Sequence, residues 1–336
     1  MSDELFLMNP KNRPDDRASL NPQQELVLTM QADQAGAFDT SAGTFEDLRK
    51  NYRREREIWN TGGPEMYASM DFSVPFENHK IHARLLRPAN DSHLPVLFYV
   101  HGGGMTVGDN DTHSLVQRKL AANSGCAVIG IEYTLSPEAQ YPQPVYECAE
   151  VIRYVTESAE TFGIDAEKIG FAGDSGGANL AMGTLLYLRD HGFRMDAVRG
   201  AVLYYGGYGL IDGSSYRLHG GSWDGMSEAD LLYYQKMYIG DRDVRTCPYY
   251  CLYTNDLTYG IPPCFMAVGQ LDPLLDDNRL FRDILTNLGV PCEYHEYPGV
   301  LHAFAQYSKV MDDAEDALRR GAHFFARCCS MPGVEN

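Results

Sequence analysis

The sequence predicts an α/β fold in which a mostly parallel central sheet is flanked by helices and carries a helical cap. Short segments that are apolar throughout alternate with helical segments, which is typical of parallel strands covered on both faces. A Gly-x-Ser-x-Gly motif, Gly173-Asp174-Ser175-Gly176-Gly177, lies where one of these apolar segments meets a helix. The 336 residues can build a large core without disulfides or metals.

The predicted elements alternate from residue 80 onward. Strands are expected at residues 81–86, 95–100, 127–133, 168–172, 201–205, 264–268 and 293–297. Helices are expected at residues 114–123, 144–162, 178–189, 277–288 and 314–326. Together these segments form one catalytic core, which we assign to residues 71–205 and 247–336.

Two further segments are expected to form the cap. Residues 45–59 form a charged helical stretch with apolar positions on or near one stripe: Phe45, Leu48, Tyr52 and Trp59. Residues 206–246 are rich in Gly, Tyr and Asp and are too long for a simple connection. We interpret residues 1–70 as N-terminal cap helices and residues 206–246 as an insertion that joins them as a lid. Candidate pocket walls, which would fit core positions equally well, are Trp59, Tyr205, Tyr208 and Trp223.

The charge balance excludes several classes of partner. The chain has 28 Lys and Arg against 46 Asp and Glu, a formal net charge of −18. Such a chain repels phosphate backbones and anionic lipid, so neither nucleic acid nor a membrane is expected as a partner. No strongly apolar run approaches the roughly 20 residues of a membrane span. The first residues lack a basic segment followed by an apolar core, so we expect a cytoplasmic protein without a signal peptide.

Cysteines, histidines and glycines suggest no metal or cofactor. The eight cysteines contain no Cys-x-x-Cys pair, so we expect reduced, buried thiols that behave as small hydrophobic groups. No His, Cys and Asp cluster has the spacing of metal ligands. Gly207-Tyr208-Gly209 lacks the third glycine of a dinucleotide-binding motif.

The Gly-x-Ser-x-Gly motif predicts a nucleophilic serine. In a tight strand-to-helix turn the central residue adopts a strained backbone, which holds Ser175 clear of the sheet at the positive end of a helix. Side chains at Gly173 and Gly177 would collide with the neighbouring strand or helix. For acyl transfer, Ser175 also needs a base, a group that orients the base, and donors for the oxyanion.

The oxyanion donors are expected in His101-Gly102-Gly103-Gly104, which follows a predicted strand directly. A His-Gly-Gly-Gly loop at this place can offer bare backbone N–H groups to a substrate that approaches closely. We assign Gly103 and Gly104 as two donors and Gly176 as the third; one such donor contributes about 10²–10³ in rate. A flexible linker is the alternative interpretation of a glycine run, but a place between strand and helix argues against it.

The acid and the base follow the serine in the order that this motif requires. Asp272 lies just past a strand end, and Asp276 and Asp277 are its rivals. Asp272 also suits the N-cap of a helix that begins with Pro273, and the two roles are compatible. His302 lies in the loop between the last strand and the last helix, which is where the base is expected.

At these motifs the chain resembles the hormone-sensitive-lipase-like α/β-hydrolases, and among them the bacterial acetyl esterases. The similar segments span nearly the whole chain: His101-Gly102-Gly103-Gly104, Gly173-Asp174-Ser175-Gly176-Gly177, Asp272-Pro273-Leu274-Leu275-Asp276-Asp277, Leu301-His302-Ala303-Phe304, Ile58-Trp59-Asn60, Glu132-Tyr133-Thr134-Leu135-Ser136-Pro137-Glu138, Trp223-Asp224-Gly225 and Pro248-Tyr249-Tyr250-Cys251-Leu252. Two segments depart from the family pattern. Gly176 stands where alanine is commoner, and Glu132-Tyr133-Thr134-Leu135 replaces Asp-Tyr-Arg-Leu behind the oxyanion loop.

The resemblance implies an α/β-hydrolase fold and a cytoplasmic carboxylesterase for a small-molecule ester substrate, with acetyl and butyryl groups preferred to long chains. It also implies protein partners: a second copy in a homodimer, and a transcriptional activator of maltose metabolism or an α-galactosidase. Alternative functions are a deacetylase of an acetylated sugar or small metabolite, and a mainly regulatory binding protein on a hydrolase scaffold.

Two competing interpretations are weaker. Gly-Asp-Ser-Gly-Gly also surrounds the nucleophile of trypsin-like proteases, but there the histidine and aspartate precede the serine and the fold is all-β. A binding protein that had lost its chemistry would be expected to lack the serine or the histidine. This chain has Ser175, Asp272 and His302 in order, so an enzyme is predicted.

Overall fold

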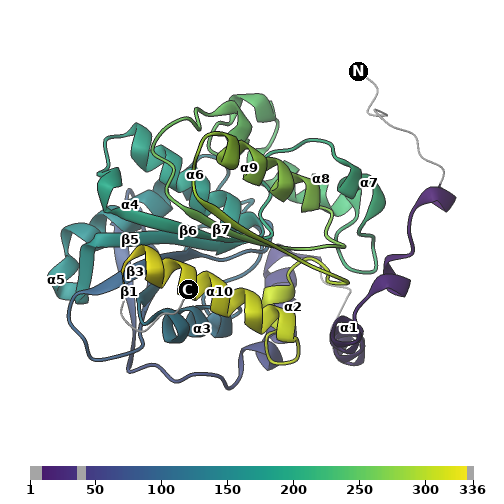
Figure 1. The fold of residues 1–336 in the computed structure, drawn as a ribbon, viewed down its shortest axis with the longest axis horizontal. Helices are drawn as coiled ribbons and strands as arrows, with labels where there is room; N and C mark the ends of the chain where they lie inside the picture. Colours follow the sequence, from purple (N-terminus) through teal and green to yellow (C-terminus); the bar gives the residue numbers. More distant parts are fainter. Residues whose placement is uncertain (1–9, 36–42, 331–336) are drawn as a thin grey trace.

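The computed structural model describes residues 10–35 and 43–330 and contains an eight-stranded sheet of order β1-β2-β4-β3-β5-β6-β7-β8 (Figure 1). The strands are β1 (Ala68–Phe76), β2 (His79–Arg87), β3 (Leu94–Val100), β4 (Ala127–Glu132), β5 (Ile164–Asp174), β6 (Val198–Tyr204), β7 (Cys264–Gly269) and β8 (Cys292–Tyr297). β2 pairs antiparallel with β1 and β4, and all other neighbours are parallel. The predicted mostly parallel sheet is therefore confirmed.

Helices cover both faces of the sheet. They are α1 (Pro22–Ala35), α2 (Phe45–Asn60), α3 (Ser114–Ser124), α4 (Gln143–Glu157), α5 (Ala159–Phe162), α6 (Gly176–Asp190), α7 (Ser214–Leu218), α8 (Glu228–Ile239), α9 (Leu275–Asn287) and α10 (Asp312–Cys328). In Figure 1, α3 and α10 lie on one face, and α4, α6 and α9 lie on the other.

The continuous apolar strands reflect burial on both faces. All seven residues of β3 are buried. Val96, Phe98 and Val100 belong to the hydrophobic cluster under α4, α6 and α9. Leu97 and Tyr99 belong to the cluster under α3 and α10, because successive side chains of a strand point to opposite faces.

The structure adds one strand that the pattern did not reveal. β1 is an edge strand with Pro75 in it, and most of its residues are exposed or half-buried. Its side chains therefore need not be apolar, and the sequence carries no burial signal there. The predicted helix at residues 144–162 is two helices, α4 and α5, which are separated at Ser158.

The two cap segments contact each other. The N-terminal segment contains η2 (Asp16–Ser19), and the insertion contains α7 and α8. Arg13 Nη2 donates to the carbonyl oxygens of His219 and Gly220 at 3.0 and 2.8 Å. Asp16 lies 2.9 Å from Nδ1 of His219. In Figure 1, α1, α7 and α8 lie at the same end of the sheet.

Within residues 10–35 and 43–330, no helix combines the length and apolar character that a bilayer crossing requires. All eight cysteines are unpaired; Cys292 and Cys328 are half-buried and the others are buried.

The sheet gives a stability prediction. Gly170 of β5 and Gly200 of β6 are register partners. A Cβ at Gly170 would lie 2.2 Å from Phe325 Cε2 of α10, whereas the nearest atom to a Cβ at Gly200 would be 3.4 Å away. We expect Gly170→Ala to lower the free energy of unfolding by about 1–3 kcal/mol through overpacking, measured by denaturant titration. Gly200→Ala is the control; an equal loss in both variants would contradict this account.

Candidate active site

Ser175 lies in a strained turn between β5 and α6. Its φ and ψ are 53° and −126°, a conformation that is uncommon for residues other than glycine. The flanking glycines leave no room for side chains. A Cβ at Gly173 would lie 2.5 Å from the carbonyl oxygen of Gly177, and a Cβ at Gly177 would lie 2.1 Å from that of Val100. The turn therefore has the geometry that the motif predicted.

The structure brings together the three side chains that the sequence selected as serine, base and acid. Nε2 of His302 lies 2.7 Å from Oγ of Ser175, and Nδ1 of His302 lies 2.7 Å from Oδ2 of Asp272. His302 belongs to the loop after β8, and Asp272 follows β7. Parallel strands end at one edge of the sheet, so residues far apart in the sequence meet there.

Asp272 is fully buried and uses both carboxylate oxygens. Oδ2 faces His302, while Oδ1 accepts a hydrogen bond from the backbone N–H of Leu274 at 2.8 Å. The predicted N-cap role of Asp272 is wrong, because α9 begins at Leu275 with Leu274 as its N-cap; the Asp272 carboxylate instead holds the turn that precedes the helix. Of its rivals, Asp276 accepts from the N–H of Ser215, and Asp277 accepts from the N–H of Tyr208.

The predicted oxyanion donors border the same space as Ser175. Gly103, Gly104 and Gly176 line one cavity with Ser175 and His302. Within the described ranges, the N–H groups of these three glycines make no hydrogen bond. Gly103 and Gly104 have φ values of 109° and 57°, which favour glycine. A Cβ at Gly104 would lie 2.4 Å from Cδ1 of Tyr234, so α8 covers this loop.

Asp174 is a site residue that sequence reasoning missed. Its Oδ1 accepts hydrogen bonds from the Tyr99 hydroxyl at 2.6 Å and from the Gly102 N–H at 2.8 Å. Its Oδ2 accepts from Nε2 of Gln306 at 3.2 Å and lies 3.5 Å from Nε2 of His113. One carboxylate thus connects the serine turn, the oxyanion loop and the segment that follows His302. Its place beside Ser175 in the motif was the available signal.

These contacts keep the buried Asp174 ionised. Burial alone would raise its pKa, but interaction with His113 and the hydrogen bonds from Tyr99 and Gly102 lower the pKa well below the usual range. His101, in the predicted loop motif, stacks on Tyr133 with ring centroids 4.5 Å apart. Burial and nearby His113 lower the pKa of His101 to about 4, so this imidazole is neutral at pH 7.

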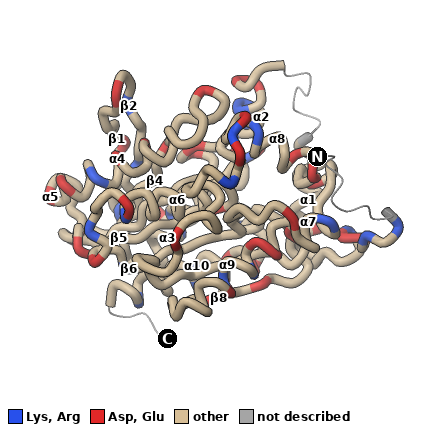
Figure 2. Tube along the Cα trace, turned by 90° about the horizontal axis from the view of Figure 1, so that it is seen from above, with Lys and Arg blue, Asp and Glu red and all other residues tan. Residues whose placement is uncertain are grey.

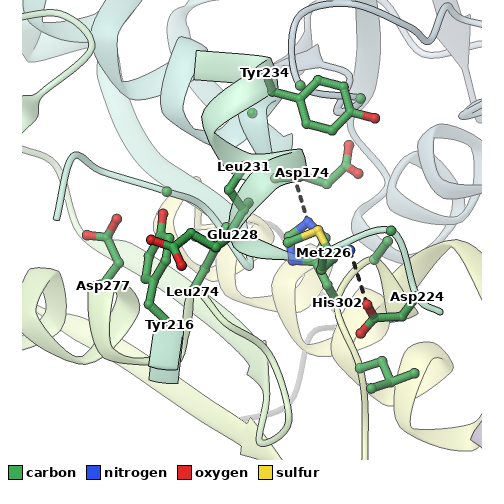
Figure 3. A pocket seen from close by; sticks show the side chains of 18 of the residues that line it. Asp174, Tyr216, Asp224, Met226, Glu228, Leu231, Tyr234, Leu274, Asp277 and His302 are labelled. Carbon is green, nitrogen blue, oxygen red and sulfur yellow. Dashed lines mark hydrogen bonds between the residues drawn. The ribbon is translucent and has the colours of Figure 1, made fainter. Parts of the chain in front are cut away.

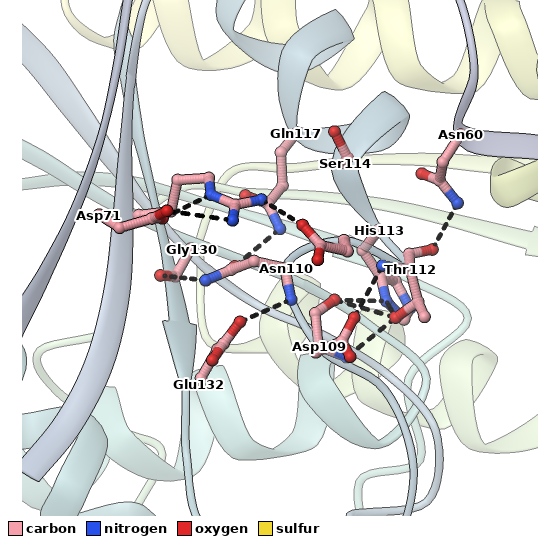
Figure 4. Close-up of polar contacts among 12 residues, drawn as sticks. Asn60, Asp71, Asp109, Asn110, Thr112, His113, Ser114, Gln117, Gly130 and Glu132 are labelled. Carbon is pink, nitrogen blue, oxygen red and sulfur yellow. Dashed lines mark hydrogen bonds and ion pairs between the residues drawn. The ribbon is translucent and has the colours of Figure 1, made fainter. Parts of the chain in front are cut away.

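A second polar network joins the segment after the oxyanion loop to β4 (Figure 4). Oε1 of Glu132 accepts a hydrogen bond from the backbone N–H of Asn110, and Nδ2 of Asn110 donates to the carbonyl oxygen of Gly130. The N–H of Thr134 donates to Oε2 of the fully buried Glu147 at 2.6 Å. Glu132 therefore takes part through its side chain, whereas Thr134 takes part only through its backbone N–H.

The cavity has a volume of about 1050 Å3 and is bordered by both cap segments. Figure 3 shows His302 and Asp224 at one end, and Tyr216, Leu274 and Asp277 at the other. Burial raises the pKa of Asp277 to about 6, although the Tyr253 hydroxyl and three backbone N–H groups oppose this shift.

The predicted pocket walls need correction at three of four positions. Trp223 lines the cavity, beneath the guanidinium of Arg17 at 4.8 Å from its ring centroid. Trp59, Tyr205 and Tyr208 lie in the core instead, with at most 1% of each residue exposed. Their rings pack against other rings: Trp59 on Tyr307, Tyr205 on His302 and Phe304, and Tyr208 on Phe281.

Among the residues that the structure describes, no group of three or more His, Cys, Asp or Glu side chains is arranged to hold a metal ion. The arrangement instead offers a hydroxyl, an imidazole and a carboxylate in one hydrogen-bonded chain, beside free backbone N–H groups. Such a set can perform nucleophilic acyl transfer.

A comparison with protein families agrees with this geometry. The family model described as the alpha/beta hydrolase fold matches residues 97–306, which include every residue of the proposed acyl-transfer set. The match confirms the predicted α/β-hydrolase fold.

Solved structures share this fold over nearly the whole chain. An esterase from Pyrobaculum calidifontis is 26% identical and aligns over 92% of this chain and 99% of its own, with a TM-score of 0.83. An α/β hydrolase enzyme from the metagenome of Lake Arreo in Spain is 26% identical over 94% of this chain and 100% of its own, with a TM-score of 0.86. A thermostable carboxylesterase from a metagenomic library shares the fold at 22% identity and a TM-score of 0.80, over 89% and 100% of the two chains.

The Asp174 contacts give a testable prediction. The Gly102 N–H and Nε2 of Gln306 both donate to the Asp174 carboxylate. In an Asp174→Asn variant, one of the two acceptor oxygens becomes an NH₂ group, which cannot accept a hydrogen bond from either donor. The oxyanion loop would then lose a hydrogen bond or share a single oxygen with Gln306. We expect kcat/KM for a p-nitrophenyl acetate-type ester to fall about 10- to 100-fold, with the fold retained by circular dichroism. The control is Asp196→Asn, an exposed aspartate in η3 (Met195–Ala197). Unchanged kinetics in Asp174→Asn would show that the carboxylate does not position the loop.

Proposed function

Because this chain belongs to the α/β hydrolase family, we propose that it is a carboxylesterase that hydrolyses short-chain acyl esters through an acyl-enzyme on Ser175. The observation that carries the proposal is the hydrogen-bonded chain from Ser175 through His302 to Asp272, with 2.7 Å at each contact. Esterase activity is further supported by the likeness to the Pyrobaculum esterase over nearly the full length of both chains.

In the first half of the proposed reaction, Nε2 of His302 accepts the proton of Ser175 while Oγ attacks the ester carbonyl carbon. The carbonyl oxygen gains negative charge and accepts hydrogen bonds from the N–H groups of Gly103, Gly104 and Gly176. Collapse of this tetrahedral intermediate breaks the bond to the alcohol oxygen, which receives the proton from His302.

In the second half, water takes the place of the alcohol. His302 accepts a proton from the water as its oxygen attacks the acyl carbonyl, and the same three N–H groups stabilise the second oxyanion. The proton then returns to Ser175 as the acid is released. Asp272 holds His302 with Nε2 directed at Ser175 and stabilises the imidazolium that forms in both halves.

The cavity favours a second candidate, deacetylation of a sugar or another small metabolite. A volume of about 1050 Å3 far exceeds the space that an acetyl or butyryl group fills, so most of it would hold the alcohol part of the ester. Asp224 lines the cavity, and its Oδ2 is buried without a hydrogen-bond partner, so it suits an alcohol that carries further hydroxyl groups.

The roles of Ser175 and His302 can be tested directly. We expect Ser175→Ala and His302→Ala each to lower kcat for p-nitrophenyl acetate by about 10³- to 10⁶-fold, because the nucleophile and its base act as a unit. Circular dichroism and thermal unfolding would verify the fold of both variants. His323→Ala on α10 is the control. Near-wild-type turnover in His302→Ala would refute its assignment as the base.

The acyl preference is tested with p-nitrophenyl esters from two to twelve acyl carbons. We expect kcat/KM to be highest for acetyl or butyryl esters and to fall steadily for longer chains. All esters are measured below the critical micelle concentration of the longest one. A lower rate for long chains then reflects the enzyme and not aggregation of the substrate. A maximum at decanoyl or longer chains would contradict the short-chain proposal while leaving the esterase chemistry intact.

A further inference from the structure

The wall of the cavity contributed by α2 contains a buried cation. Arg56 lines the cavity and is only 8% exposed. α2 carries basic and acidic residues along its length, visible as blue and red bands in Figure 2, but Arg53 and Arg54 on the same helix are exposed. Arg56 is one helical turn after Tyr52 and nearly one turn before Trp59, so it occupies the stripe that faces the protein.

Aromatic rings and hydrogen bonds fix the position of this guanidinium. Its central carbon lies 4.9 Å from the ring centroid of Tyr52 and 5.3 Å from that of Tyr307. Nη1 donates to the Tyr307 hydroxyl at 2.9 Å, and that hydroxyl also accepts from Nε2 of Gln31. Nε lies 2.8 Å from Oε2 of Glu55, an ion pair that is not aligned as a hydrogen bond. The side chain is therefore held before any ligand arrives.

One nitrogen of the guanidinium, Nη2, makes no hydrogen bond within the described residues. An arginine has five N–H donors, yet Nη2 of Arg56 bonds to none of the residues that the structure describes. Nε of Arg56, Oε1 of Gln306 and the hydroxyl of Tyr205 are buried without a hydrogen-bond partner. The Arg56 charge lowers the pKa of Tyr205 against the larger effect of burial, which places the two within electrostatic reach.

The other arginines of the cavity wall differ. Arg17 is exposed and lies over the ring of Trp223. Arg217 is paired with Asp212 at 2.9 Å and with Glu228 at 3.6 Å. Arg56 alone among these three combines deep burial with unused donors.

We propose that Arg56 binds a carboxylate carried by the ester substrate, so that the enzyme prefers esters with an anionic group to their neutral isosteres. This proposal rests on the proposed esterase function and names a substrate class for it. A guanidinium matches a carboxylate with a planar fork of donors, and burial strengthens such a pair. Nη1 is occupied by the Tyr307 hydroxyl, so Nη2 is the donor that a ligand in the cavity would meet.

The experiment uses two matched pairs of esters, one for each side of the scissile bond. For the acyl side we would compare the p-nitrophenyl monoester of glutarate with the corresponding glutaramate ester. For the alcohol side we would compare 4-acetoxybenzoate with 4-acetoxybenzamide. The readout is the ratio of kcat/KM for the anionic member to that for the neutral member, which a purely structural role of Arg56 would leave unchanged.

We expect the wild-type protein to favour the anionic member of one pair about 10- to 100-fold, the range for a hydrogen bond to a charged group. Arg56→Gln should bring this ratio close to one, and Arg56→Lys should give an intermediate value because an ammonium lacks the planar fork. Arg54→Gln is the matched control: it removes the same charge from the exposed side of α2 and should keep the wild-type ratio.

Three outcomes would overturn the proposal: a wild-type preference for the neutral member in both pairs, the same ratio in wild type and Arg56→Gln, or an equal loss in Arg54→Gln. If Arg56→Gln unfolds because Tyr307 loses its partner, the Arg56→Lys ratio decides. Ser175→Ala separates the two proposals. Full hydrolysis of all four esters by that variant would remove the proposed acyl-enzyme on Ser175, whereas the ratio concerns Arg56 alone.

Discussion

The rest of the site depends on the hydrogen bonds that the Asp174 carboxylate accepts. It belongs to the turn that presents Ser175, it accepts the N–H of Gly102 at the start of the oxyanion loop, and it accepts Nε2 of Gln306 just after His302. One buried carboxylate thus holds together three parts of the chain that are far apart in the sequence. Because the charge is inside the protein, its hydrogen bonds are strong, and the cost of leaving any of them unmade is high.

The sheet explains why this carboxylate can reach all three parts. β3 and β5 are parallel neighbours, with Val100 in register with Gly173, so the oxyanion loop and the serine turn leave the sheet side by side. β6 and β7 lie next in order, and the segments after β7 and β8 supply Asp272 and His302. The cap then covers this edge, with Tyr234 of α8 against Gly104.

Much of this arrangement could be predicted from sequence because it depends on local rules. Gly173 and Gly177 indicate a turn that has no room for side chains. The central strands are apolar because both faces of the sheet are buried. The pocket walls could not be predicted in the same way. Trp59, Tyr205 and Tyr208 are aromatic residues that suit a core or a cavity equally, and only the packing of Tyr307, Phe304 and Phe281 decides which. The burial of Arg56 could not be predicted either, because a charged residue in a highly charged helix is expected to be exposed to solvent.

The cap is assembled from segments some two hundred residues apart in the sequence, joined where Arg13 and Asp16 meet His219 and Gly220. The N-terminal segment also holds the loop of the base, because Oε1 of Gln24 accepts a hydrogen bond from the N–H of Leu301, the residue before His302, and the N–H of Asn21 donates to the carbonyl oxygen of Gly299. Substitutions in this segment would therefore change the fit of the substrate and the position of the imidazole together. For biocatalyst engineering, selectivity and rate are coupled through this part of the chain.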